Sequence, residues 1–294
     1  MQLRGVWIRS SPHVNKTLSS PQVITIIEPR SGWRAINFRE LWRYRDLLYF
    51  LAWRDVKVRY KQTVLGAAWA VLQPFMTMVV FSVFFGRLGG MDAKVPDVAY
   101  ELFVYAGILP WTFFAAAVTQ SSQSLLANSN LISKVFFPRL IVPCSSIGAG
   151  LVDFAVSFGV MLVLMAVYGI GLSVNLAMIP CLVVGTVIAA LGVGTLLAAL
   201  TVEYRDFRYV VPFLVQLWMF ASPVAYPLEV IPPDWRLVYS LNPMAGLISG
   251  FRSAFLGQPF HWDCLAVSML VAFASSAFGA AYFRRVERRF ADIV

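Results

Sequence analysis

The sequence predicts an all-α membrane protein: six transmembrane helices, a cytoplasmic amphipathic interfacial helix before the first, and re-entrant helices between the fifth and the sixth. Hydrophobic residues make up 59% of the 294 residues and charged residues only 13%, which is unusual for a soluble domain. Six apolar stretches each approach the ~20 residues that a helix needs to cross ~30 Å of hydrocarbon. Such spans leave little room for a large catalytic or nucleotide-binding domain.

The six apolar stretches are the predicted spans. They cover residues 65–85, 102–126, 141–168, 174–200, 209–227 and 264–283. Because Lys and Arg stay on the cytoplasmic side of a membrane, their distribution tests this count. With six spans and both termini in the cytoplasm, 20 of the 24 Lys and Arg residues fall on the cytoplasmic side. The net charge of +9 therefore reports topology, and nucleic acid is excluded as a partner.

The chain before the first span divides into two parts. Residues 1–35 are predicted to be a poorly ordered extension, and they contain no apolar region of a signal peptide. Residues 36–62 are predicted to form the interfacial helix, because Asn37 and Glu40 resemble a capping box and aromatic and basic residues alternate after them. The simplest role of this helix is to anchor the chain on anionic headgroups. Residues 63–294 form the six-span domain.

The segment 228–262, between the last two spans, is too rich in Leu, Ile and Phe for a hydrated loop. Its pattern is interrupted at Asn242 and Pro243, which predicts two short amphipathic or re-entrant helices. Non-helical backbone at membrane depth is tolerated only against protein or a water-filled cavity. The segment is therefore predicted to cover an opening on the outer side.

Motifs for cofactor chemistry are missing from the sequence. No Gly-Lys dipeptide occurs, so there is no P-loop for ATP. His13 and His261 cannot form a metal cluster by themselves. The three cysteines, Cys144, Cys181 and Cys264, lie in or beside apolar runs and are interpreted as small hydrophobic side chains. We expect no metal and no cofactor on this chain.

Asp153 is the only clearly ionisable residue within the spans, and such a residue is a functional candidate by default. However, ion-coupled carriers usually place several polar groups near the middle of the membrane. No basic partner for Asp153 is evident. The interpretation favoured is a structural role, with hydrogen bonds to Ser or Thr on other helices, and a functional role stays open.

Aromatic residues recur along the first, second and fifth spans. Their faces can stack on the apolar faces of sugar rings without fixed hydrogen bonds, so they are candidates for lining a channel through which a glycan slides. Contact with lipid is the alternative. The predicted channel residues are Trp69, Phe75, Phe81, Phe84, Trp111, Trp218, Phe220 and Tyr226.

Motifs in three parts of the chain resemble those of one family, the ABC-2 type permeases that export bacterial surface polysaccharides. They are 53–69 (WRDVKVRYKQTVLGAAW) with 72–74 (LQP), 130–139 (NLISKVFFPR), and 204–207 (YRDF) with 222–227 (SPVAYP) and 241–243 (LNP). The resemblance extends from about Leu41 to the C-terminus and is specific, because the motifs occur in order at positions compatible with the spans. Residues 1–35 carry none of it.

The resemblance implies a homodimer in the cytoplasmic (inner) membrane that is paired with two copies of a separate P-loop ABC ATPase. That ATPase would bind ATP and Mg, so this chain would be a permease subunit and not an enzyme. The resemblance further implies that residues 130–139 form a coupling helix in a cleft of the ATPase and that 228–257 form periplasmic gate helices. The coupling residues are Asn130, Leu131, Lys134, Phe136, Phe137 and Arg139, and the gate residues are Trp235, Tyr239, Asn242, Pro243, Phe251 and Arg252.

The predicted substrate is a lipid-linked polysaccharide, with O-antigen favoured over capsule or teichoic acid. A permease for a small lipid or drug is the first alternative. An ion-coupled carrier and a membrane glycosyltransferase or acyltransferase are more distant ones. A transferase predicts clustered acids or histidines at a membrane face, and the cytoplasmic loops offer only Glu203 and Asp206, beside Arg205 and Arg208.

Overall fold

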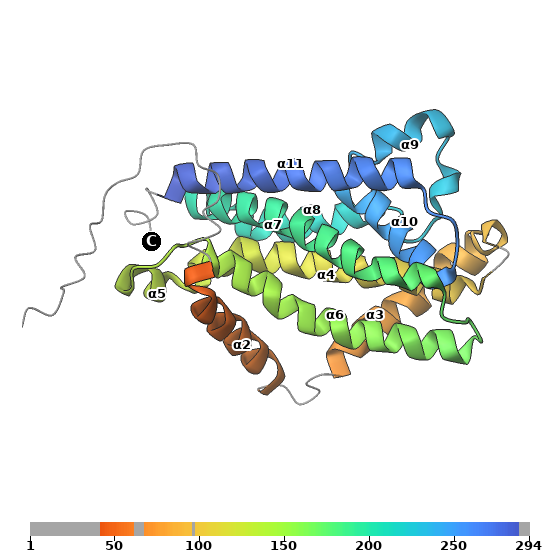
Figure 1. The fold of residues 1–294 in the computed structure, drawn as a ribbon, viewed down its shortest axis with the longest axis horizontal. Helices are drawn as coiled ribbons and strands as arrows, with labels where there is room; N and C mark the ends of the chain where they lie inside the picture. The colour runs from red at the N-terminus through yellow and green to blue at the C-terminus, as the bar shows by residue number, and fades with distance from the viewer. Residues whose placement is uncertain (1–41, 62–67, 96–97, 288–294) are drawn as a thin grey trace, which may run out of the picture. The chain divides into compact units, whose positions relative to one another are not determined.

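The computed structural model describes residues 42–61, 68–95 and 98–287, which all belong to one compact unit, Arg34–Val294. The N-terminal extension and the predicted capping box lie outside the described residues. Every regular element within the described residues is helical (Figure 1). The longer elements are α2 (Arg45–Lys61), α3 (Ala68–Phe81), α4 (Tyr100–Ala127), α5 (Ser129–Lys134), α6 (Ile141–Val167), α7 (Ile179–Glu203), α8 (Phe207–Phe220), α9 (Pro233–Tyr239), α10 (Pro243–Leu256) and α11 (Trp262–Glu287).

Five helical stretches in the described part of the chain are long and apolar enough to cross a membrane. They are Ala68–Leu88, Tyr100–Ala127, Ile141–Val167, Val174–Glu203 and Trp262–Glu287. The first includes the π-helical stretch η1 (Ser82–Leu88) after α3, and the fourth includes the 3-10 stretch η3 (Val174–Met178) before α7. They match the first four predicted spans and the sixth, which confirms the multi-span helical class.

The fifth predicted span, 209–227, is shorter in the structure. Its helix α8 has 14 residues, which is about 21 Å at 1.5 Å per residue and less than the ~30 Å of hydrocarbon. Residues 221–226 form turns. Pro223 explains the end of the helix, because proline lacks an N–H and disfavours the helical conformation at the residue before it, Ser222.

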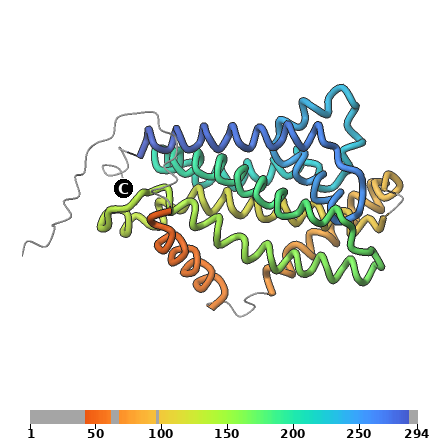
Figure 2. Tube along the Cα trace, in the orientation of Figure 1, coloured from red at the N-terminus to blue at the C-terminus, as the bar shows by residue number. Residues whose placement is uncertain are grey.

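The helices pack around α4, which is the most buried of the spans. α4 contacts α6 and α7 along its length, and α7 contacts α11, so these four helices lie side by side (Figure 1). The trace in Figure 2 shows α2 running obliquely away from this group while it contacts α6. α3 is the least buried span, so much of its apolar surface faces away from the rest of the chain.

The close contact between α7 and α11 depends on glycine. A Cβ atom at Gly279 of α11 would lie 2.3 Å from the carbonyl oxygen of Gly192 on α7 and 2.9 Å from Oγ1 of Thr195. Small residues of this kind let two membrane helices approach until their backbones touch. The tight packing of the last span on the fourth therefore requires the absence of a side chain at position 279.

The segment between α8 and α11 contains the short η4 (Leu228–Val230), α9 and α10. The break predicted at Asn242 and Pro243 is confirmed, because α9 ends at Tyr239 and α10 begins at Pro243. α9 is largely exposed, whereas every residue from Pro243 to Phe255 is buried against α11, α4 and α7. α10 is therefore an internal helix and not an amphipathic one at the surface.

We predict that Gly279→Val destabilises the subunit by about 1–3 kcal/mol, because the new side chain must displace backbone in a filled interface. Gly159→Val in α6 is the matched control, since a Cβ there meets nothing within 4 Å. Thermal unfolding of the purified, detergent-solubilised protein measures the difference. Equal melting temperatures for the two variants would show that the α7–α11 contact is not tight.

Candidate functional site

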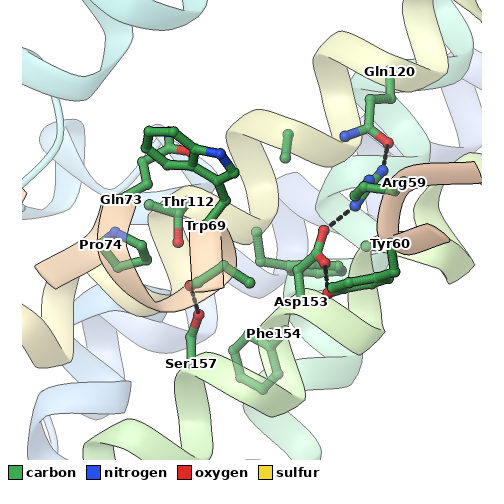
Figure 3. Close-up of a pocket in the computed structure, with 14 residues that line it drawn as sticks. Arg59, Tyr60, Trp69, Gln73, Pro74, Thr112, Gln120, Asp153, Phe154 and Ser157 are labelled. Carbon is green, nitrogen blue, oxygen red and sulfur yellow. Dashed lines mark hydrogen bonds and ion pairs between the residues drawn. The ribbon is translucent and has the colours of Figure 1, made fainter. Parts of the chain in front are cut away.

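The structure joins Asp153 of α6 to the interfacial helix α2. Arg59, near the end of α2, forms an ion pair with one carboxylate oxygen of Asp153, and the Tyr60 hydroxyl donates a hydrogen bond to the other. The Arg59 guanidinium also donates to Oε1 of Gln120 on α4, at 2.5 Å. Side chains of three helices therefore meet at one polar cluster (Figure 3).

The expectation that Asp153 has no basic partner is wrong. Its partner is 94 residues away in the sequence and comes from a helix predicted to lie on the membrane surface. Asp153 is 12 residues after the start of α6, about 18 Å along that helix, so the end of α2 reaches well beside the span. Arg59 and Tyr60 belong to the motif 53–69, which is the signal that could have identified them.

Burial, the hydrogen bond to Asp153 and the charge of that carboxylate together raise the pKa of the Tyr60 hydroxyl to about 12. Tyr60 therefore stays protonated near neutral pH and remains a hydrogen-bond donor. Because Asp153 accepts from both Arg59 and Tyr60, its charge is compensated inside the protein.

A cavity of about 320 Å³ lies beside this cluster, between α2, α3, α4 and α6. Arg59 and Asp153 are the only charged residues among those that line it in the described part of the chain. Seven of the 14 lining residues are polar and seven are apolar. The lining residues are Arg59, Tyr60, Trp69, Ala70, Gln73, Pro74, Thr112, Phe113, Ala116, Gln120, Gly150, Asp153, Phe154 and Ser157.

The predicted channel residues fall into three groups. Trp69, Phe75, Phe84 and Phe220 are exposed on α3, η1 and α8. Trp218 and Tyr226 are half-buried. Phe81 and Trp111 lie in the core of the subunit, with 8% and 3% of their surface exposed, so in this conformation they face no opening.

The exposed face of α8 carries an apolar stripe that is more regular than the sequence analysis proposed. Its residues follow each other at helical spacing on one side of the helix. They are Tyr209, Phe213, Leu217 and Phe220, and each exposes half or more of its surface. Of these, only Phe220 was among the predicted channel residues.

The predicted coupling segment contains two adjacent phenylalanines with different environments. Phe136 exposes 80% of its surface, whereas Phe137 exposes 5% and packs in a second hydrophobic cluster with Ile132 and Leu51. Asn130 and Lys134 are exposed, and Leu131 is half-buried. Phe137 therefore holds the segment on its own subunit, and Phe136 is left available for a partner.

Hydrogen bonds fix both ends of the coupling segment. Arg139 donates from Nη1 to the carbonyl oxygen of Glu287 at 2.6 Å and from its backbone N–H to Oε1 of the same residue at 3.2 Å. At the other end, Arg54 of α2 donates to Oδ1 of Asn128 at 2.8 Å. The segment is thus tied to the end of α11 and to the interfacial helix.

Asn242 organises the start of α10. Its Oδ1 accepts hydrogen bonds from the backbone N–H of Met244, which caps α10, and from Nε1 of Trp218 at 3.0 Å. Its Nδ2 donates to Oγ of Ser222 and to the carbonyl oxygen of Ala221. Tyr226 adds a hydroxyl contact of 2.8 Å to Tyr239 of α9, whereas Trp235 of α9 is exposed.

Arg252 fixes the middle of α10. Its buried guanidinium donates to the carbonyl oxygens of Phe103, Val224 and Tyr226 and lies 3.7 Å from the centroid of the Phe103 ring. These carbonyl dipoles and the ring stabilise the cation. Phe251, the preceding gate residue, is fully buried and stacks edge-on against Phe154 of α6.

The described residues contain no group of three or more His, Cys, Asp or Glu that could hold a metal ion. Glu203, one of the acids considered for a transferase, accepts a hydrogen bond from the Tyr282 hydroxyl at 3.1 Å.

The described structure is that of a multi-pass helical membrane protein, with helices of spanning length, an ion pair at the flank of one of them and a buried helix before the last of them. The chain belongs to the ABC-2 type transporter family, whose model matches residues 46–256. This family assignment confirms the resemblance inferred from the sequence motifs.

Curated relatives cover most of the chain. The O-antigen export system permease protein RfbA of Klebsiella pneumoniae is 29% identical over 250 residues, which are 85% of this chain and 95% of the relative. The protein of the same name from Myxococcus xanthus is 33% identical over 219 residues, 74% of this chain and 83% of the relative. The polysialic acid transport protein KpsM of Escherichia coli is 24% identical over 236 residues, 74% of this chain and 86% of the relative.

We predict that the Arg59–Asp153 pair shows a coupling free energy of about 1 kcal/mol in a double-mutant cycle. The two side chains are 31% and 28% exposed, so solvent screening keeps the value modest. Arg59→Gln and Asp153→Asn should each lower the melting temperature of the purified protein, and the double variant should lose less than their sum. Strictly additive effects would mean that the two charges do not stabilise each other.

Proposed function

We propose that this chain is the transmembrane subunit of an ATP-driven exporter that moves lipid-linked O-antigen polysaccharide across the cytoplasmic membrane. The observation that carries the proposal is the similarity to O-antigen export permeases over 74–85% of the chain. The exposed aromatic faces of α3 and α8 support it, because aromatic rings stack on sugars with little demand for fixed hydrogen bonds.

ATP and Mg bind to a separate ATPase in this proposal, and two ATPase copies serve a homodimer of this chain. Phe136, at the cytoplasmic side, is the anchor that enters a cleft of the ATPase. The segment behind it is held by Phe137, Arg139 and Asn128, so a push on Phe136 moves α2, α5 and the end of α11 together.

The exposed faces of α3 and α8 from two subunits enclose the polymer channel. The apolar stripe of α8 supplies one wall, and Phe75 and Phe84 extend along the other. α9 and α10 close its periplasmic side, and Asn242 and Arg252 hold α10 to α8 and α4. The dimer has two states, one with the channel open and one with it closed. ATP binding shifts the dimer from one state to the other only if the two states bind the ATPase with different affinities.

Export of a capsular polysaccharide is the second candidate, and the similarity to KpsM favours it. The two candidate functions differ in the polymer that is exported and not in the architecture of the exporter, so the same fold is compatible with both. Chemical analysis of the polymer that the cell retains when this chain is absent separates the two.

We predict that cells from which this chain is deleted retain the polysaccharide inside, and that renewed expression of the chain restores polymer at the cell surface. The double variant Phe213→Ala and Phe220→Ala should restore export about tenfold less well, since aromatic contacts contribute about 0.5–1.5 kcal/mol each. Immunoblots of surface polymer measure the effect.

Phe273→Ala with Phe278→Ala, on the exposed side of α11, is the matched control and should restore export fully. Equal export by both double variants would exclude stacking on α8. Unchanged surface polymer in the deletion strain would exclude polysaccharide export itself.

We predict that Phe136→Ala lowers the amount of ATPase that co-purifies with the subunit by about tenfold without changing its melting temperature, because the ring contacts little of its own chain. Phe137→Ala should instead lower the melting temperature, at a cost of about 3–5 kcal/mol for a buried ring. Retention of ATPase by Phe136→Ala would assign docking to another surface.

A further inference from the structure

The cavity beside Asp153 has features of a binding site that are separate from the proposed channel. We propose that it binds a short, uncharged glycan segment, with Trp69 as the stacking surface and Arg59, Asp153 and Gln120 as the hydrogen-bonding wall. This inference rests on the proposed function, because it assigns a recognition site for the exported polymer within one subunit.

The position of the cavity distinguishes it from the channel. It is lined by α2, α3, α4 and α6, and α8 contributes no residue to it. Trp69 lies in the first turn of α3, exposes 52% of its surface and is at the side of the cavity next to Gln73 and Thr112 (Figure 3). Because Gln120 lies eight residues nearer than Thr112 to the proposed cytoplasmic end of α4, a ligand from that side meets the polar cluster before it reaches this ring.

The charges of the lining favour an uncharged ligand. Arg59 and Asp153 are of opposite sign and already paired, so the lining of described residues carries no net charge. A lipid phosphate would have to compete with the Asp153 carboxylate for Arg59 and would be repelled by it. A polyhydroxylated ligand faces neither cost.

The hydrogen-bonding groups match vicinal hydroxyls. Asp153 accepts, Arg59 donates, and the amides of Gln120 and Gln73 do both. A guanidinium and a carboxylate side by side can donate to one hydroxyl and accept from its neighbour. A hydrocarbon chain would gain nothing from these groups and would separate them from water.

The remaining wall is suited to the apolar face of a sugar ring. Phe113 and Phe154, whose ring centroids are 5.6 Å apart, line the cavity together with Pro74. The volume of about 320 Å³ is near the lower limit of ligand pockets, which is about 300 Å³. The cavity therefore holds a short segment of glycan and does not conduct the polymer.

Site-specific photo-crosslinking in cells tests this proposal on the full chain with its ATPase. Gln73→p-benzoylphenylalanine places the probe in the cavity. Val163→p-benzoylphenylalanine is the control, because Val163 is 62% exposed on α6 and outside the cavity. After illumination, the position 73 variant should yield at least tenfold more carbohydrate-positive adduct than the position 163 variant, and none in cells that cannot make the polymer.

Two further variants in the position 73 background separate binding from folding. Trp69→Ala should remove most of the adduct, and Trp69→Phe, which keeps an aromatic face, should retain it at an unchanged subunit level. Adduct of equal intensity in cells without the polymer would identify a membrane lipid and overturn the proposal, as would absence of glycan adduct at position 73.

Surface export measured in the same cells keeps the two proposals distinguishable. Dependence of export on this chain without a glycan adduct at position 73 would reject the cavity as a glycan site and leave the proposed function standing. Surface polymer that does not depend on this chain would reject both.

Discussion

A hydrocarbon layer offers no hydrogen-bond partner, so every polar group placed in it must be satisfied by the protein itself. The described fold is consistent with this constraint in its backbone, which is helical in every spanning element. The same constraint explains why two charged side chains that are buried or half-buried are paired with polar groups from other parts of the chain. Asp153 is met by Arg59 and Tyr60, and Arg252 is met by three carbonyl groups and a ring. Each of these clusters joins helices that are far apart in the sequence.

Two hydrophobic clusters divide the subunit along its length. The main core surrounds α4 and α10, whereas the second gathers the ends of several helices around Phe137 and Leu51. Because α5 and α2 belong to the second cluster, they are packed as part of one block with the end of α11. In the proposed exporter this block receives the motion of the ATPase, and Arg59 carries it to α6 through the ion pair.

The sequence predicted most of the elements for physical reasons that are local. Hydropathy located the long spans, and Asn242 with Pro243 located the break before α10, because proline acts on its immediate neighbours. The end of α8 at Phe220 was missed since an apolar run continues through Ala221 and beyond Pro223. Partners were harder to predict: nothing local to Asp153 indicates Arg59. Likewise, the sequence does not show which of Phe136 and Phe137 faces inward, because the backbone between α5 and α6 is not helical.

The guanidinium of Arg252 also constrains a residue on another helix. A Cβ atom at Gly107 of α4 would lie 2.7 Å from Nη2 of Arg252 and 3.0 Å from the carbonyl oxygen of Val224. Any side chain at position 107 therefore occupies space that the arginine needs, and a shorter residue at position 252 would leave a void beside the glycine. Substitutions at the two positions are therefore coupled during evolution. A residue larger than glycine at position 107 fits this packing only in a lineage that has already lost the arginine at position 252.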